Sequence, residues 1–98
     1  MDFDKLVHQP TRLKIFSHLY RHGTAPFTEL AEELDVTEGN LSSHLQTMED
    51  AGALRVEKEF VDRKPRTTYE LTEEGEGLFE GHVETLEAHT PDQQAAPE

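Results

Sequence analysis

A cluster of short polar residues lies between positions 37 and 51. The apolar residues of this stretch, Leu41, Leu45 and Met48, fall within about 60° of one another at the helical turn of about 100° per residue, so they must face a core. The opposite face then carries small or hydrogen-bonding residues without charge: Gly39, Asn40, Ser43, Gln46 and Thr47, with Ser42 at its edge and Thr37 as the N-cap. Asn and Gln amides can pair with adenine through two hydrogen bonds, and Ser and Thr hydroxyls can approach most base edges. The pattern predicts hydrogen bonding to bases in the major groove of DNA, and an ordinary solvated face is the alternative.

Two residues of this helix need a separate interpretation. Gly39 costs a helix about 1 kcal/mol relative to alanine, unless its bare backbone closely approaches another surface, which DNA would supply. His44 lies on the border of the buried face. We expect His44 to pack and form hydrogen bonds rather than contact a base.

Positive charge is concentrated in a second segment. Five of the nine basic residues fall within positions 55–66, and none follows Arg66. Within this window, residues 62–67 are predicted to form the polar tip of a hairpin. Arginine suits bidentate phosphate contact or insertion into a narrow minor groove. We therefore expect Arg63, Lys64 and Arg66 to bind the DNA backbone or the minor groove, and a solvated turn is the alternative. Arg12 and Lys14, at the start of the first long helix, are weaker candidates for a backbone contact, since Arg12 could equally pair with a nearby acid.

The elements that must position these groups follow from periodicity and capping residues. Phe3, Leu6 and Val7 predict a helical turn before Pro10, which suits the first turn of a helix ending near Gly23. Residues 24–27 are predicted to be an extended connection. A short helix capped by Thr28 and a longer helix capped by Thr37 and ended by Gly52 are predicted next. Two strands follow, the first with Leu54, Val56 and Phe60 on one side and the second with Tyr69 and Leu71. The last predicted element is a helix capped by Thr72. Two short helices joined by a few residues indicate a helix-turn-helix.

The net charge of −12 is unusual for a DNA-binding protein, which usually has a positively charged surface. We interpret the acidity as a solvated surface adapted to high intracellular salt, where a Debye length of about 3 Å at molar salt screens self-repulsion. A DNA mimic or an acidic protein-interaction module without DNA binding of its own is the alternative. The basic hairpin tip favours DNA binding, because a purely protein-binding relative has little reason to gather cations there.

Composition and motifs exclude several other functions. The 98 residues form one small domain, and the chain contains no cysteine, so thiolate metal sites and thiol nucleophiles are excluded. No stretch approaches the ~18 apolar residues of a membrane span. His18 and His22 have a metal-binding spacing of i, i+4, but no obvious third ligand completes the site. We expect a cytoplasmic protein that is not an enzyme and has no cofactor, no metal and no membrane contact.

Residues 8–79 resemble a bacterial and archaeal family of small winged-helix regulators related to the MarR and ArsR groups. The resemblance rests on residues 8–15, Gly39-Asn40-Leu41-Ser42-Ser43-His44-Leu45, Glu49-Asp50-Ala51-Gly52, Lys64-Pro65-Arg66-Thr67 and Leu71-Thr72-Glu73-Glu74-Gly75. It implies an α+β, mainly α, winged helix-turn-helix with a three-helix core, a two-stranded β-wing and a C-terminal helix. It also implies a transcription regulator that binds duplex DNA sequence-selectively as a dimer.

The predicted assembly is a homodimer through the N-terminal and C-terminal helices. Gly75, Gly77 and Gly81 weaken the last helix by about 1 kcal/mol each relative to alanine, so it needs a packing partner. The turn around Leu6 also lacks apolar partners in so short a chain. We expect residues 1–89 to form the DNA-binding domain, and residues 90–98 to form a disordered acidic tail.

Overall fold

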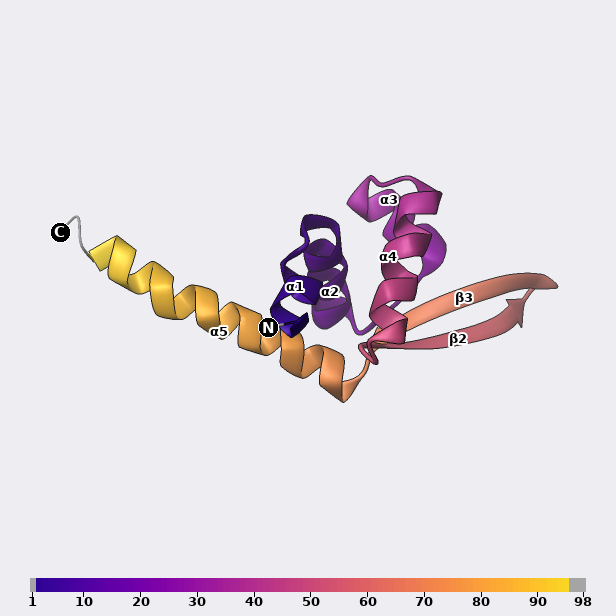
Figure 1. Cartoon of the computed structure of the whole chain (residues 1–98). Helices are drawn as coiled ribbons and strands as arrows, with labels where there is room; N and C mark the ends of the chain where they lie inside the picture. The colour runs from indigo at the N-terminus through magenta and orange to yellow at the C-terminus, as the bar shows by residue number, and fades with distance from the viewer. Residues whose placement is uncertain (1, 96–98) are drawn as a thin grey trace.

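The computed structural model describes the backbone of residues 2–95 and the side chains of residues 5–84. It has a mainly helical α+β fold, and Figure 1 shows α5 and the β2–β3 hairpin extending to opposite sides of the helix cluster. The elements are α1 (Asp2–His8), α2 (Pro10–His22), β1 (Thr24–Pro26), α3 (Phe27–Leu34), α4 (Glu38–Asp50), β2 (Leu54–Val61), β3 (Lys64–Leu71) and α5 (Glu73–Ala95). The predicted fold class is confirmed.

The core lies where α2, α3 and α4 meet the base of the sheet. Ile15 and Phe16 of α2 are completely buried, as are Leu30 of α3 and Leu41 of α4. The predicted apolar stripe of α4 is confirmed, because its three members are at most 2% exposed. This stripe fixes which face of α4 is turned to solvent.

The sheet has three strands in the order β1-β3-β2, all antiparallel, rather than the two predicted. Residues 24–26, expected to be a plain connection, pair with β3, and Ala25 sits fully buried opposite Tyr69. A three-residue strand is too short to show the alternation by which strands are recognised in a sequence. The wing proper is the β2–β3 hairpin.

Most predicted helix ends are confirmed. Gly23 and Gly52 take positive φ values of 89° and 82°, and the Thr37 hydroxyl accepts a hydrogen bond from the Asn40 amide at 3.2 Å. The prediction for Thr28 is wrong, since α3 begins at Phe27 with Pro26 in the N-cap position. Pairing of β1 with β3 holds Pro26 extended, so the helix starts immediately after the strand.

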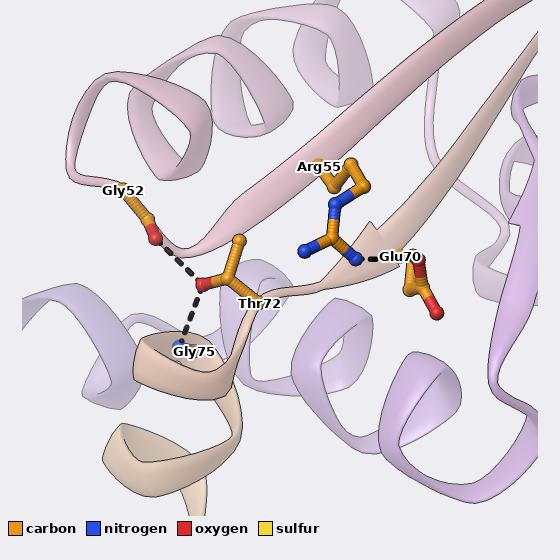
Figure 2. Close-up of polar contacts among 5 residues, drawn as sticks. All are labelled: Gly52, Arg55, Glu70, Thr72 and Gly75. Carbon is orange, nitrogen blue, oxygen red and sulfur yellow. Dashed lines mark hydrogen bonds and ion pairs between the residues drawn. The ribbon is translucent and has the colours of Figure 1, made fainter.

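Thr72 joins α5 to the end of α4, as Figure 2 shows. Its hydroxyl donates to the Gly52 carbonyl at 2.6 Å and accepts from the Gly75 amide at 3.0 Å, which confirms it as a cap. Its backbone amide donates to the Ala53 carbonyl at 3.0 Å. A Cβ atom on Gly75 would overlap that same carbonyl oxygen. Gly75 is therefore required for packing, whereas the sequence indicated only a weakened helix.

The predicted disordered tail needs a correction, because α5 continues to Ala95. Good helix formers, among them Gln93, Gln94 and Ala95, follow Pro91, and a helical backbone can continue past a proline at the loss of one hydrogen bond. Residues 96–98 of the predicted tail lie outside the described residues. Within residues 2–95, no helix has the length and apolarity needed to cross a bilayer.

Replacing Gly75 with alanine should lower the free energy of unfolding by about 1–3 kcal/mol, because the added methyl group meets backbone that cannot move aside cheaply. Gly77→Ala is the matched control: the same helix gains a methyl group that meets open space, so stability should rise by up to ~1 kcal/mol. Urea unfolding followed by circular dichroism measures both. Equal changes for the two variants would show that the Gly75 contact is unimportant.

Candidate nucleic-acid interface

The helix-turn-helix consists of α3, a three-residue turn and α4. Asp35 takes a left-handed conformation (φ 54°) in the turn, and Thr37 caps α4. All seven residues predicted on the DNA-reading surface of this segment are exposed: Thr37, Gly39, Asn40, Ser42, Ser43, Gln46 and Thr47. The structure thus brings them to one solvent-facing side, opposite the buried stripe.

Some of these side chains already have local partners. The Gln46 amide donates to the Asp50 carboxylate at 2.9 Å, and the Thr47 hydroxyl donates to the Ser43 carbonyl at 3.0 Å. The side chains of Asn40 and Ser42 form no hydrogen bond within the part of the chain that the structure describes. Gln46 must therefore break its hydrogen bond to Asp50 before its amide nitrogen can donate to a base.

Arg12 is half-buried, and among the described residues its guanidinium contacts α1 and α4 rather than an acid. Its Nε donates to the Leu6 carbonyl at 2.8 Å, Nη2 to the Lys5 carbonyl at 3.4 Å, and Nη1 lies 3.1 Å from Nδ1 of His44. The predicted packing role of His44 is confirmed by this contact. Burial, and then the neighbouring Arg12 cation, lower the pKa of His44 below its ordinary value. A neutral ring can accept the hydrogen bond from Arg12, which connects α1, α2 and α4.

Histidine protonation should weaken this connection. Because the pKa of His44 is lowered in the folded state, its contribution is fully present above about pH 6.5 and is lost as pH falls from there toward the lowered pKa. The drop in unfolding free energy between about pH 7.5 and about pH 5.5 should be smaller in His44→Gln, whose carbonyl can still accept from Arg12. Urea unfolding at the two pH values measures this drop for the wild type and for the variant. All other titrating groups are the same in both proteins, so the difference between the two drops reports His44. If the unfolding free energies of wild type and His44→Gln depended on pH identically, the stabilising role assigned to neutral His44 would be contradicted.

The wing presents its predicted cations at the far end of the hairpin. Arg63, Lys64 and Arg66 are all exposed. Asp62 and Arg63 have positive φ values of 53° and 68°, as in the type I′ turns that suit the twist of paired strands. Arg66 lies opposite Glu59 in the strand register, and it also lines the groove between the hairpin and the helices. Four residues closer to the base of the hairpin, Arg55 forms a 2.9 Å ion pair with Glu70 (Figure 2).

Alternation along the strands divides the hairpin into two faces. We call the inner face the one that contains buried Leu54 and Leu71, with Tyr69 packed against Phe27 of α3 at a ring distance of 6.5 Å. The outer face carries Arg55, Glu57, Glu59, Val61, Lys64, Arg66, Thr68 and Glu70. Lys58 lies on the inner face opposite Thr67, and the sequence reasoning missed it although it falls on the alternation of Leu54 and Val56.

An open groove separates the inner face of the hairpin from α3 and α4. Its walls include Thr28 and Ser42 on the helical side, and Lys58, Pro65 and Thr67 on the hairpin side. Ser42 belongs to the predicted DNA-reading surface. The inner face of the wing and that surface therefore open toward the same side of the molecule.

The histidine pair considered for metal binding has another partner. His18 is buried, and its Nε2 lies 2.8 Å from the Glu29 carboxylate, while its ring lies 4.5 Å from that of His22. Among the residues whose side chains are described, no three His, Cys, Asp or Glu residues are arranged to hold a metal ion.

Comparison with known proteins agrees with this geometry. Residues 11–89 match the family model described as a winged helix DNA-binding domain. A transcriptional regulator homologue from Pyrococcus horikoshii OT3 is 31% identical, with 95% of this chain and 98% of that chain covered and a TM-score of 0.84. A protein of Enterococcus faecalis V583, described as a transcriptional regulator of the MarR family, is 28% identical over 98% and 87% of the two chains (TM-score 0.83). An uncharacterized protein of Methanocaldococcus jannaschii is 29% identical over 79 residues, 81% of this chain and 86% of its own.

The fold and the exposed polar helix define a DNA-binding regulator of the winged-helix class. The chain belongs to the winged helix DNA-binding domain family, and its structural neighbours include MarR-family regulators.

Proposed function

We propose that this protein is a transcription regulator that binds duplex DNA sequence-selectively and catalyses no reaction. In this proposal α4 enters the major groove, and the wing contacts the backbone or the minor groove. The observation that carries the proposal is the exposed polar face of α4, which is held outward by three buried residues on the opposite face. A helix so fixed can present hydrogen-bonding groups to base edges in a defined register.

Base reading is assigned to the first half of α4. Asn40, Ser43 and Gln46 carry the groups that pair with base edges, while exposed Gly39 lets the backbone approach closely. Thr37, Ser42 and Thr47 complete the surface through hydroxyl groups. Short side chains at these positions favour a close fit of the helix into the groove.

Phosphate binding is assigned to the wing tip. With a net charge of −12, the body of the protein repels DNA, so attraction must come from the exposed cations that project farthest. Arg63, Lys64 and Arg66 meet that requirement. We also propose that the acidity adapts the surface to high salt, which screens the repulsion between protein and DNA. A purely protein-binding module is the alternative that the net charge favours.

The assembly proposed is a homodimer through α1 and α5. These helices pack against each other, and Leu6 and Val7 are buried within one chain, so the expectation that the turn around Leu6 lacks apolar partners was wrong. The surface left for a second copy is a groove between α2 and α5, which is lined by Tyr20, Phe79 and Val83 together with Glu80 and Glu84. Tyr20 is 43% exposed, although its hydroxyl donates to Glu80 at 2.7 Å. A two-fold dimer would cover this surface and place two copies of α4 about 34 Å apart for a palindromic site.

Separate substitutions should distinguish base reading from phosphate binding. Replacing Arg63, Lys64 and Arg66 together with alanine should weaken binding to all duplexes alike and flatten the log–log salt dependence by up to ~0.9 per lost phosphate contact. Gln46→Ala or Ser43→Ala should instead cost ~1–3 kcal/mol on the preferred site and little on random DNA. Salt titrations with a site selected from genomic fragments and with a random duplex measure both.

Arg55→Ala is the matched control for the wing, because Arg55 is a cation of the same hairpin already paired with Glu70. It should bind DNA nearly as well as wild type. Wild-type affinity in the triple variant would remove the wing from the interface. Equal losses on specific and random DNA in the helix variants would show that α4 does not read sequence. No binding by the wild-type protein to any genomic fragment would favour the protein-interaction module.

A further inference from the structure

The side chain of Phe60 is the most exposed large apolar group in the described part of the chain, at 76%. The sequence placed it on the same side of β2 as Leu54 and Val56. Alternation does put Phe60 on the inner face, but its pair with Pro65 is the second from the tip of the hairpin. The far end of this hairpin extends beyond the helices (Figure 1). Because exposed Pro65 lies directly opposite Phe60 in the strand register, the two side chains form a small apolar area on the inner face near the tip of the wing.

The charges around Phe60 show what kind of partner fits. From residue 54 to residue 71, the inner face carries one cation, Lys58, and no carboxylate, while the acids of both strands all lie on the outer face. The acid nearest the tip is Asp62, which lies in the turn itself. In a chain with 21 acidic residues, this segregation leaves the inner face of the wing open to a polyanion.

The position of the ring relative to the helices supports the same partner. Phe60 pairs across the strands with Pro65, and Pro65 lines the groove that Ser42 of the DNA-reading surface also lines. Arg63 and Lys64 come immediately before Pro65 in the chain. A duplex seated on α4 would therefore meet the inner face of the wing, with the ring flanked by cations that can reach its phosphates.

We propose that Phe60 is a DNA-contacting residue that places its ring against the sugars and bases of the minor groove, with Pro65 packed behind it. This inference rests on the proposed function and assigns to the wing an apolar contact in addition to its charges. Apolar side chains inserted in the minor groove are a known means of gripping or unstacking a base step. The contact carries no charge, so it adds affinity that salt does not screen.

The test uses Phe60→Ala in the full chain, with Val61→Ala as the matched control. Val61 is the next residue, also apolar and 37% exposed, but it lies on the outer face. Anisotropy of a labelled duplex about 30 base pairs long, which spans two half-sites one helical turn apart, gives the affinity across a salt series. Phe60→Ala should bind roughly tenfold more weakly at every salt concentration, with the salt slope of wild type. Val61→Ala should bind like wild type.

A second variant reports the contact directly. The chain contains no tryptophan, so Phe60→Trp introduces a fluorophore whose emission reports only the wing. Its emission should shift or be quenched when saturating duplex is added. Unchanged emission on a demonstrably bound duplex, or equal affinities for Phe60→Ala and Val61→Ala, would overturn the inference while leaving the proposed function intact.

Two other outcomes would overturn the proposed contact between Phe60 and DNA. A lower light-scattering mass for Phe60→Ala in the absence of DNA would assign the ring to a protein interface and overturn the proposal. Failure of the wild-type protein to bind any duplex in the same assay would remove the proposed function itself, and the inference with it. Thermal unfolding of Phe60→Ala should match that of wild type, since the ring is largely outside the core.

Discussion

The packing of one face of α4 on α2 is the contact on which the rest of the structure depends. Leu41, Leu45 and Met48 are buried against a core that contains Ile15 and Phe16, and rotation of α4 about its axis would expose them. The polar face is therefore oriented by apolar burial on the other side, not by its own interactions. The link from Arg12 to His44 adds a polar restraint that ties α1 to the same helix.

The base of the hairpin carries paired and acidic side chains, whereas its tip carries exposed cations. At the base, Arg55 is neutralised by Glu70, and the outer face carries further acids. At the tip, Arg63 and Lys64 lie beyond those acids with Asp62 of the turn beside them, and the inner face of the two strands has no carboxylate. For a protein of net charge −12, this arrangement gives DNA one direction of approach that is not dominated by repulsion. The wing and α4 both open to that direction.

Sequence periodicity predicted the helices, the buried stripe of α4 and the capping roles of Thr37 and Thr72, because these depend on neighbours a few residues apart. Features that depend on distant pairing were not predictable. The strand β1 exists only through its register with β3, and Gly75 is required only because Ala53 lies against it. Alternation assigned Phe60 to the correct face, yet it could not show where the core ends along the hairpin. The DNA-reading residues were predicted as a group and are all exposed, and their contacts with DNA stay predictions.

The central claim, that α4 and the wing together receive duplex DNA, is tested most directly by nuclear magnetic resonance of the isotope-labelled protein titrated with a duplex. The account predicts amide shift changes concentrated at residues 37–47 and 58–66. Residues of α5 such as Glu80 and Val83 should change little, because this helix extends to the side opposite the hairpin (Figure 1). Shifts centred on α5 or on the acidic outer face of the hairpin, with residues 37–47 unchanged, would contradict it.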